Sequence, residues 1–119
     1  MADVTLLHNP RCSTSRAALD EIGTAGVDAR VVHYLRDPLD EAQLRELVEQ
    51  LEDPVTDLVR RDATFAALGL IDADVQTADQ VVALLAQHPK LMQRPVLVRD
   101  GRAIIGRPKD RVPAFLQDG

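Results

Sequence analysis

Short apolar runs rich in β-branched residues alternate with amphipathic helical patterns, and this order restricts the chain to an α/β fold. The runs predict four strands, at residues 4–8, 30–35, 95–99 and 102–105. Helical spacing predicts one helix between the first two strands, several in the middle of the chain, and a closing one at residues 110–117. Asp100-Gly101, between the last two strands, is typical of a two-residue hairpin turn.

Capping signals set the expected ends of the helices. Ser13 or Thr14 is expected to cap the first helix, and Gly26 is expected to stop it. Two of the middle helices open on an acid or a threonine followed three residues later by glutamine, which is a capping-box pattern. The middle helices are expected at residues 40–51, 55–61, 64–68 and 77–88.

The predicted order is strand, helix, strand, helical stretch, hairpin and closing helix. Parallel strands joined by a helix take a right-handed crossover, so we expect a mixed four-stranded sheet made of one parallel pair and one hairpin. This is the order of a thioredoxin-like domain. We expect a single domain over residues 1–119, with the helices of roughly 40–90 inserted between the two halves of the sheet.

Composition argues against several classes of protein. The net charge of −5 and the pI of about 5.0 disfavour a nucleic-acid binder, which usually has a basic face. No apolar run approaches the ~20 residues of a membrane helix. Met1-Ala2-Asp3 is acidic where a signal peptide would be basic. We therefore expect a cytoplasmic protein, and a monomer because no exposed apolar stripe is evident.

The one cysteine, Cys12, falls between a predicted strand end and a predicted helix start. A helix N-terminus and the flanking Arg11 and Arg16 both favour the thiolate, which is the reactive form of cysteine. Backbone N–H groups in such a turn bind oxyanions, and three hydroxyl residues follow Cys12. We therefore expect a reactive thiolate beside an anion site. Because the chain has no second thiol, any resolving thiol must come from another molecule.

Three other roles for Cys12 fit the sequence less well. A lone cysteine is most often a small buried hydrophobic residue, but the polar neighbours here disfavour that role. A phosphatase-type Cys-x5-Arg loop would need arginine where Ala18 stands. A dithiol Cys-x-x-Cys site would need cysteine where Ser15 stands, so the site is of the monothiol kind.

Four segments together resemble one known family. They read His8-Asn9-Pro10-x-Cys12-Ser13-Thr14-Ser15-Arg16, Leu58-Val59-Arg60, His88-Pro89-x-Leu91-x-x-Arg94-Pro95-Val96 and Gly106-Arg107-Pro108. In order and spacing they resemble the ArsC family, the glutaredoxin-linked arsenate reductases, over almost the whole chain. The first and third segments are highly specific when they occur together.

The resemblance implies a role for each matching residue. Cys12 would be the nucleophile that forms a covalent adduct with arsenate, and the anion-binding arginines would be Arg60, Arg94 and Arg107. The chain has 12 arginines, so one arginine alone would be a weak signal, whereas three that match family motifs are a strong one. The Arg94-Pro95 bond is expected to be cis.

The remaining residues of the first motif are candidates for anion binding or for activation of the thiol. They are His8, Ser13, Thr14, Ser15 and Arg16. His33 and His88 are interpreted as structural. No Cys, His or carboxylate spacing indicates zinc, so we expect no metal and no bound cofactor.

The family resemblance also implies a mechanism. Cys12 attacks arsenate, an external thiol such as glutathione attacks the adduct, and a glutaredoxin-like partner resolves the mixed species as arsenite leaves. Arginine suits the anion because its planar fork makes paired hydrogen bonds to tetrahedral oxyanions.

Two departures from the family pattern keep alternatives open. Ser13 stands where some members have glycine, and the chain resembles a short-form subgroup without the C-terminal extension. One alternative is a redox-related regulator that binds RNA polymerase, although those relatives carry a second cysteine where Ser15 stands. Another is a thiol-transferase that acts on small-thiol adducts and has no arsenate role.

Overall fold

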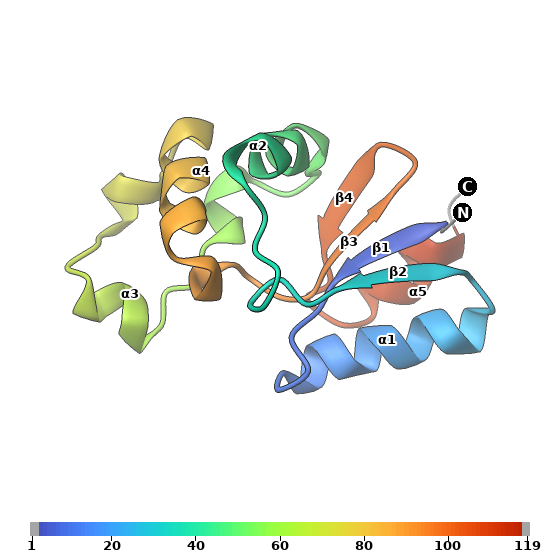
Figure 1. The fold of residues 1–119 in the computed structure, drawn as a ribbon. Helices are drawn as coiled ribbons and strands as arrows, with labels where there is room; N and C mark the ends of the chain where they lie inside the picture. The colour runs from blue at the N-terminus through green and yellow to red at the C-terminus, as the bar shows by residue number, and fades with distance from the viewer. Residues whose placement is uncertain (1–2, 118–119) are drawn as a thin grey trace.

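The computed structural model describes residues 3–117, and its fold is built on a mixed four-stranded sheet (Figure 1). The strands are β1 (Val4–Leu7), β2 (Ala29–Val32), β3 (Val96–Arg99) and β4 (Arg102–Ile105), in the spatial order β2-β1-β3-β4. β1 pairs parallel with β2 and antiparallel with β3, and β4 pairs antiparallel with β3. The predicted α/β class and the combination of a parallel pair with a hairpin are confirmed. The two residues at either end of the expected 1–119 domain lie outside the described part.

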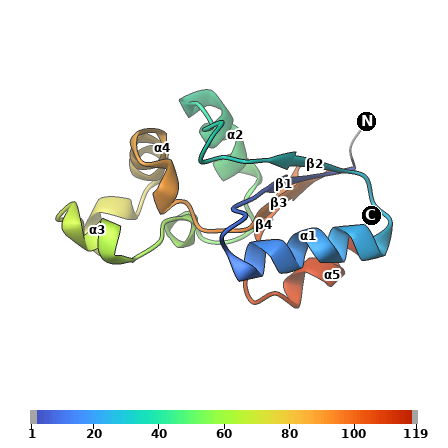
Figure 2. The same cartoon turned by 60° about the horizontal axis from the view of Figure 1, so that its bottom comes forward.

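Helices lie on both faces of this sheet. α1 (Ser13–Ala25) and α5 (Arg111–Gln117) lie together on one face, as both views show (Figures 1 and 2). The other helical elements form a group toward one end of the sheet. They are α2 (Glu41–Gln50), the 3-10 turn Val55–Leu58, α3 (Ala63–Ala67), the 3-10 turn Asp72–Val75, α4 (Ala78–Gln87) and the 3-10 turn Pro89–Leu91.

Strand periodicity divides the core in two. In β1, Val4 and Leu6 pack with the apolar residues of α1 and α5, whereas Leu7 packs with the middle helices. β3 divides in the same way, since Leu97 faces α1 and α5 and Val96 faces the other side. Successive side chains of a strand point to opposite faces, so one sheet supports two apolar layers.

Several boundaries differ from the sequence prediction. β2 ends at Val32 and not at 35, because its pairing with β1 ends at Leu7↔Val32, so His33 lies beyond the strand. The predicted helix at 55–61 is a shorter 3-10 turn, because Val59 bridges Met92 instead. The two later 3-10 turns were not predicted.

The start of α1 also differs from the prediction. Its N-cap is Cys12, in extended conformation, and neither Ser13 nor Thr14 caps the helix, because both lie within its first turn. The Cys12 N–H donates to the Asn9 carbonyl at 3.0 Å. This hydrogen bond closes a turn, so the helix begins one residue earlier than a Ser13 cap would allow. The stop at Gly26 is confirmed: its φ is 69°, a left-handed conformation that glycine adopts readily.

Candidate active site

Cys12 lies at the N-terminus of α1 with a free thiol, and the residue is 6% exposed. Burial raises the pKa of the Cys12 thiol, but the Arg94 side chain and the backbone N–H groups of Ser15 and Thr14 act against it. Their combined effect prevails, and the pKa lies below its ordinary value. The sulfur is therefore set up to ionise at the helix N-terminus.

Two arginines from the hairpin half of the sheet meet at this sulfur. Arg107 follows β4, and its Nη2 lies 3.3 Å from Cys12 Sγ, while its Nε donates to the Arg94 carbonyl at 2.7 Å. Arg94 precedes β3, and its Nε and Nη1 are buried without a hydrogen-bond partner. Buried guanidinium donors usually have partners, so these two are available to an anion.

The backbone at Gly106, just before Arg107, packs closely against Pro95, just after Arg94. Gly106 donates its N–H to the Pro95 carbonyl at 2.9 Å. A Cβ at Gly106 would lie 2.8 Å from Cγ of Pro95, so a side chain there would push the two segments apart. The Arg94-Pro95 and Arg107-Pro108 peptides are both cis; the second was not anticipated from the sequence.

Arg60 is held separately from the other two arginines. Its Nη1 forms an ion pair with Asp62 Oδ2 at 3.1 Å and reaches the Lys90 carbonyl at 3.4 Å. Its backbone N–H donates to the Leu91 carbonyl at 2.8 Å. Arg107 thus contacts the Cys12 sulfur and Arg94 lowers the pKa of its thiol, whereas Arg60 is held by Asp62 among the middle helices.

Tyr34 interacts electrostatically with these groups, although it was not a candidate from the sequence. Its residue is 1% exposed, and burial raises the pKa of its phenol. Arg94, the Asn9 side chain and Arg60 act in the opposite direction, while the Cys12 charge adds to the rise. The phenol therefore feels the charges of the site and stays protonated. The available signal was that it is the chain's one tyrosine and lies near the end of the strand predicted at residues 30–35.

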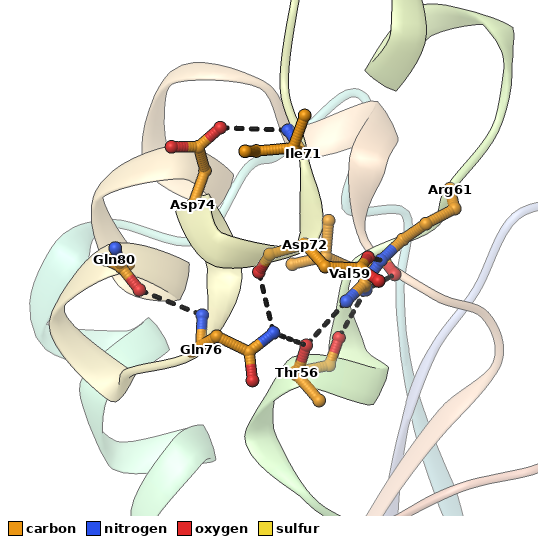
Figure 3. Close-up of polar contacts among 8 residues, drawn as sticks. All are labelled: Thr56, Val59, Arg61, Ile71, Asp72, Asp74, Gln76 and Gln80. Atoms are coloured by element: carbon orange, nitrogen blue, oxygen red, sulfur yellow. Dashed lines mark hydrogen bonds and ion pairs between the residues drawn. The ribbon is translucent and has the colours of Figure 1, made fainter.

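Arg61, directly after Arg60, shows how a neighbouring arginine is used structurally (Figure 3). Its Nη1 donates to the Thr56 and Val59 carbonyls, both at 2.6 Å, and its Nη2 donates to Thr56 Oγ1 at 2.5 Å. Its Nε pairs with Asp72 at 3.1 Å. Arg61 therefore ties the 3-10 turns at 55–58 and 72–75 together behind Arg60.

His8 and Ser15 form a buried pair that spans the loop before Cys12 and the first turn of α1. His8 Nδ1 lies 2.7 Å from Ser15 Oγ, which also accepts the Asn9 N–H at 3.0 Å. Burial, His33 and Arg16 lower the pKa of His8, which favours the neutral ring. A neutral His8 with its proton on Nε2 accepts a hydrogen bond at Nδ1 from the Ser15 hydroxyl. The Ser15 hydroxyl is thus engaged with the loop.

The other candidates of the first motif lie around the opening of α1. Arg16 Nη1 donates to the Pro10 carbonyl at 2.9 Å, so its guanidinium holds the loop. Ser13 is exposed and Thr14 is half-buried at the first turn. The ring centroid of His33 lies 5.6 Å from that of His8 in an edge-on arrangement.

A groove lies beside the same loop. Its volume is about 430 Å³, and it lies between the loop before Cys12 and the segment after β2. Its lining includes the cationic residues Arg11 and Arg36 and the exposed side chain of Leu35. Within residues 3–117, no three His, Cys, Asp or Glu side chains gather as a metal site would require. No helix in that range has the length and apolar character to cross a membrane.

Comparisons with known proteins indicate one family and the same fold. The model of the ArsC family matches residues 7–115. An arsenate reductase of Neisseria meningitidis is 35% identical over 98% of this chain and all of the relative. An Escherichia coli protein, uncharacterized YfgD, is 38% identical over 92% of each chain. The solved structure of an arsenate reductase from Vibrio cholerae is 34% identical, with a TM-score of 0.83 over 93% of this chain and 95% of that one.

The fold and the monothiol site thus define a thioredoxin-like protein with an arginine-lined cysteine. The chain belongs to the ArsC family.

Proposed function

We propose that this protein reduces arsenate to arsenite, with Cys12 as the nucleophile. The observation that carries the proposal is the 3.3 Å contact between Arg107 Nη2 and Cys12 Sγ, beside the buried, unpartnered donors of Arg94. We assign arsenate as the anion because relatives that align along nearly the whole chain carry the name arsenate reductase.

The first step needs positive charge at the sulfur. A thiolate and an arsenate ion repel each other unless cations offset both charges, and preorganised guanidinium groups do this without reorganisation. Sulfur forms a bond to arsenic, and one arsenate oxygen leaves as water after taking up protons. The free donors of Arg94 bind the remaining oxygens, Arg107 stabilises the sulfur, and Arg60 is the third anion-binding cation.

The second stage consumes two thiol equivalents from outside the chain. We assign glutathione or a similar small thiol to the attack on the adduct, and a glutaredoxin-like protein to its resolution. Two thiols lose two electrons in forming a disulfide, and arsenic gains them in passing from arsenate to arsenite. The one water formed overall is the water released in the first step. The 430 Å³ groove beside the loop supports access for such a thiol. A supply of reduced thiols fits the cytoplasm.

The loop residues have a supporting role in this scheme. His8 and Ser15 fix the loop that delivers Cys12 to the helix, and Arg16 holds the loop through Pro10. Thr14 and Ser13 occupy the first turn, where backbone N–H groups stabilise a thiolate or an oxyanion.

A coupled assay tests the proposal. Arsenite formation is measured with glutathione and glutaredoxin, for wild type, Cys12→Ser, and Arg45→Ala. Arg45 pairs with Asp79 at the surface of the α2–α4 group and serves as the arginine control. We expect Cys12→Ser to lose turnover and Arg45→Ala to keep it. Unchanged turnover in Cys12→Ser would contradict the role of Cys12 as the nucleophile.

A thiol-transferase is the second candidate, favoured by the cationic groove beside the cysteine. Arg11 and Arg36 suit a carboxylate-bearing thiol adduct. Cys12-dependent reduction of glutathione mixed disulfides, together with no arsenite formed under any thiol donor, would favour this activity over the first.

A further inference from the structure

Asp53 and Arg111 close the outer edge of β4 at its last residue, Ile105. Asp53 Oδ2 accepts the Ile105 N–H at 2.9 Å, and Asp53 Oδ1 accepts a hydrogen bond from Arg111 Nη1 at 2.8 Å. The same Nη1 donates to the Ile105 carbonyl at 2.8 Å. One ion pair therefore satisfies both outward backbone groups of Ile105, which an edge strand would otherwise leave unpaired.

The Asp53 side chain of this ion pair is largely shielded from solvent. The Asp53 side chain is 15% exposed and that of Arg111 is 32% exposed. Charge-assisted hydrogen bonds in such a setting are stronger than neutral ones and less screened than surface pairs. The pair joins three separate parts of the chain: the segment after α2, the end of β4 and the start of α5.

The chain reaches Arg107 two residues after this anchor. Arg111 Nη1 also approaches the Arg107 carbonyl, at 3.4 Å. On the other side, the Gly106 N–H is bound to the Pro95 carbonyl at 2.9 Å. The backbone that carries Arg107 is thus fixed on both sides, just where its guanidinium extends to Cys12 Sγ.

We propose that Asp53 and Arg111 are positioning residues that hold Arg107 against the Cys12 sulfur. This inference rests on the proposed role of Arg107 in the reaction. Neither residue reaches the sulfur, so both act through the backbone of 105–107. Supporting groups of this kind matter because reactive constellations tolerate only small displacements.

A neighbouring ion pair offers a matched control. Glu52 precedes Asp53 and pairs with Arg102 at the start of β4, with Arg102 Nη2 3.3 Å from Glu52 Oε1. This pair ties the same two segments together but lies at the opposite end of the strand from Arg107. Its loss should cost fold stability without moving Arg107.

The test compares Asp53→Asn with Glu52→Gln in wild-type and Arg107→Ala backgrounds. The rate of Cys12 alkylation by iodoacetamide is followed against pH, which reports thiolate formation whether or not arsenate is the substrate. Urea midpoints report stability, and the KM for arsenate is measured where turnover is found. If Asp53→Asn does not fold, Arg111→Lys replaces it, since lysine keeps the charge but cannot place its ammonium where the guanidinium holds Nη1.

We expect Asp53→Asn to slow alkylation near neutral pH roughly threefold to tenfold and to raise the KM for arsenate, with Glu52→Gln matching wild type in both. In the Arg107→Ala background, Asp53→Asn should have no further effect on alkylation. The same slowing in both backgrounds, or an unchanged alkylation profile in Asp53→Asn, would overturn the inference. Absence of arsenate turnover in wild type would instead count against the proposed function alone.

Discussion

Arg107 donates from Nε to the carbonyl oxygen of Arg94 at 2.7 Å, so the two arginines at the Cys12 sulfur form one connected unit. Arg94→Ala keeps this backbone carbonyl, but the two side chains act on the same sulfur, so their effects on the thiol should be coupled. We expect Arg94→Ala and Arg107→Ala each to slow Cys12 alkylation near neutral pH by roughly fivefold to tenfold, through a higher pKa of the thiol. The double variant should lose less than the product of the two single effects.

The measurement is the second-order rate of alkylation against pH for the four proteins. A product of effects in the double variant would mean that the arginines act independently. Arg45→Ala is again the control for the loss of one positive charge, because Arg45 pairs with Asp79 away from Cys12.

Gly106 should tolerate no side chain. Its absent Cβ leaves room for Pro95 Cγ, which would lie at 2.8 Å, and for Leu97 Cδ1, at 3.1 Å. A proline ring cannot rotate away, so Gly106→Ala must displace backbone, at a cost of about 1–3 kcal/mol. We expect a lower urea midpoint and slower Cys12 alkylation together. Gly23→Ala is the control, because a Cβ there meets nothing within 4 Å.

Local pattern predicted the sheet well because strand periodicity and the Asp100-Gly101 turn are encoded within a few residues. Both turn residues have positive φ, 53° and 75°, as a tight hairpin turn of this kind requires. The predicted α1 cap, Ser13 or Thr14, was wrong for a physical reason: the hydrogen bond from Cys12 N–H to the Asn9 carbonyl closes a turn that makes Cys12 the N-cap. Helical spacing contains no information about that turn.

The site was predictable only in part. Family motifs gave Cys12 and the arginines, but not that Arg60 is engaged by Asp62 while Arg94 is left with free donors. The Asp53–Arg111 pair spans 58 positions of sequence and fits no motif, so only the tertiary structure brings it together. Contacts of this kind depend on which segments the fold makes neighbours.

Arg61 should matter for stability more than for chemistry. It donates to the Thr56 and Val59 carbonyls and to the Thr56 hydroxyl and pairs with Asp72 (Figure 3). Arg61→Ala therefore removes four charge-assisted contacts, one of them to the part-buried Val59 carbonyl. We expect a loss of about 2–3 kcal/mol in the free energy of unfolding, measured by urea denaturation. The pH profile of Cys12 alkylation should stay that of wild type. A shifted profile with full stability would assign Arg61 to the site itself.

His8 should make the fold sensitive to mild acid. Burial, His33 and Arg16 lower the pKa of His8 below 6.5, so the unfolded chain takes up a proton there before the folded protein does. The stabilisation from the neutral ring is therefore complete above 6.5 and is lost as pH falls toward the folded pKa. Protonation would also remove the acceptor that Nδ1 offers to the Ser15 hydroxyl.

Urea midpoints measured from neutral pH down through this window test the prediction. Wild type should lose stability more steeply than His8→Gln as the pH falls, because glutamine does not titrate. The variant is less stable at neutral pH, so the slopes and not the absolute midpoints carry the comparison. Parallel curves for the two proteins would mean that His8 binds its proton equally in the folded and unfolded states, and the buried His8–Ser15 pair would then have no part in acid stability.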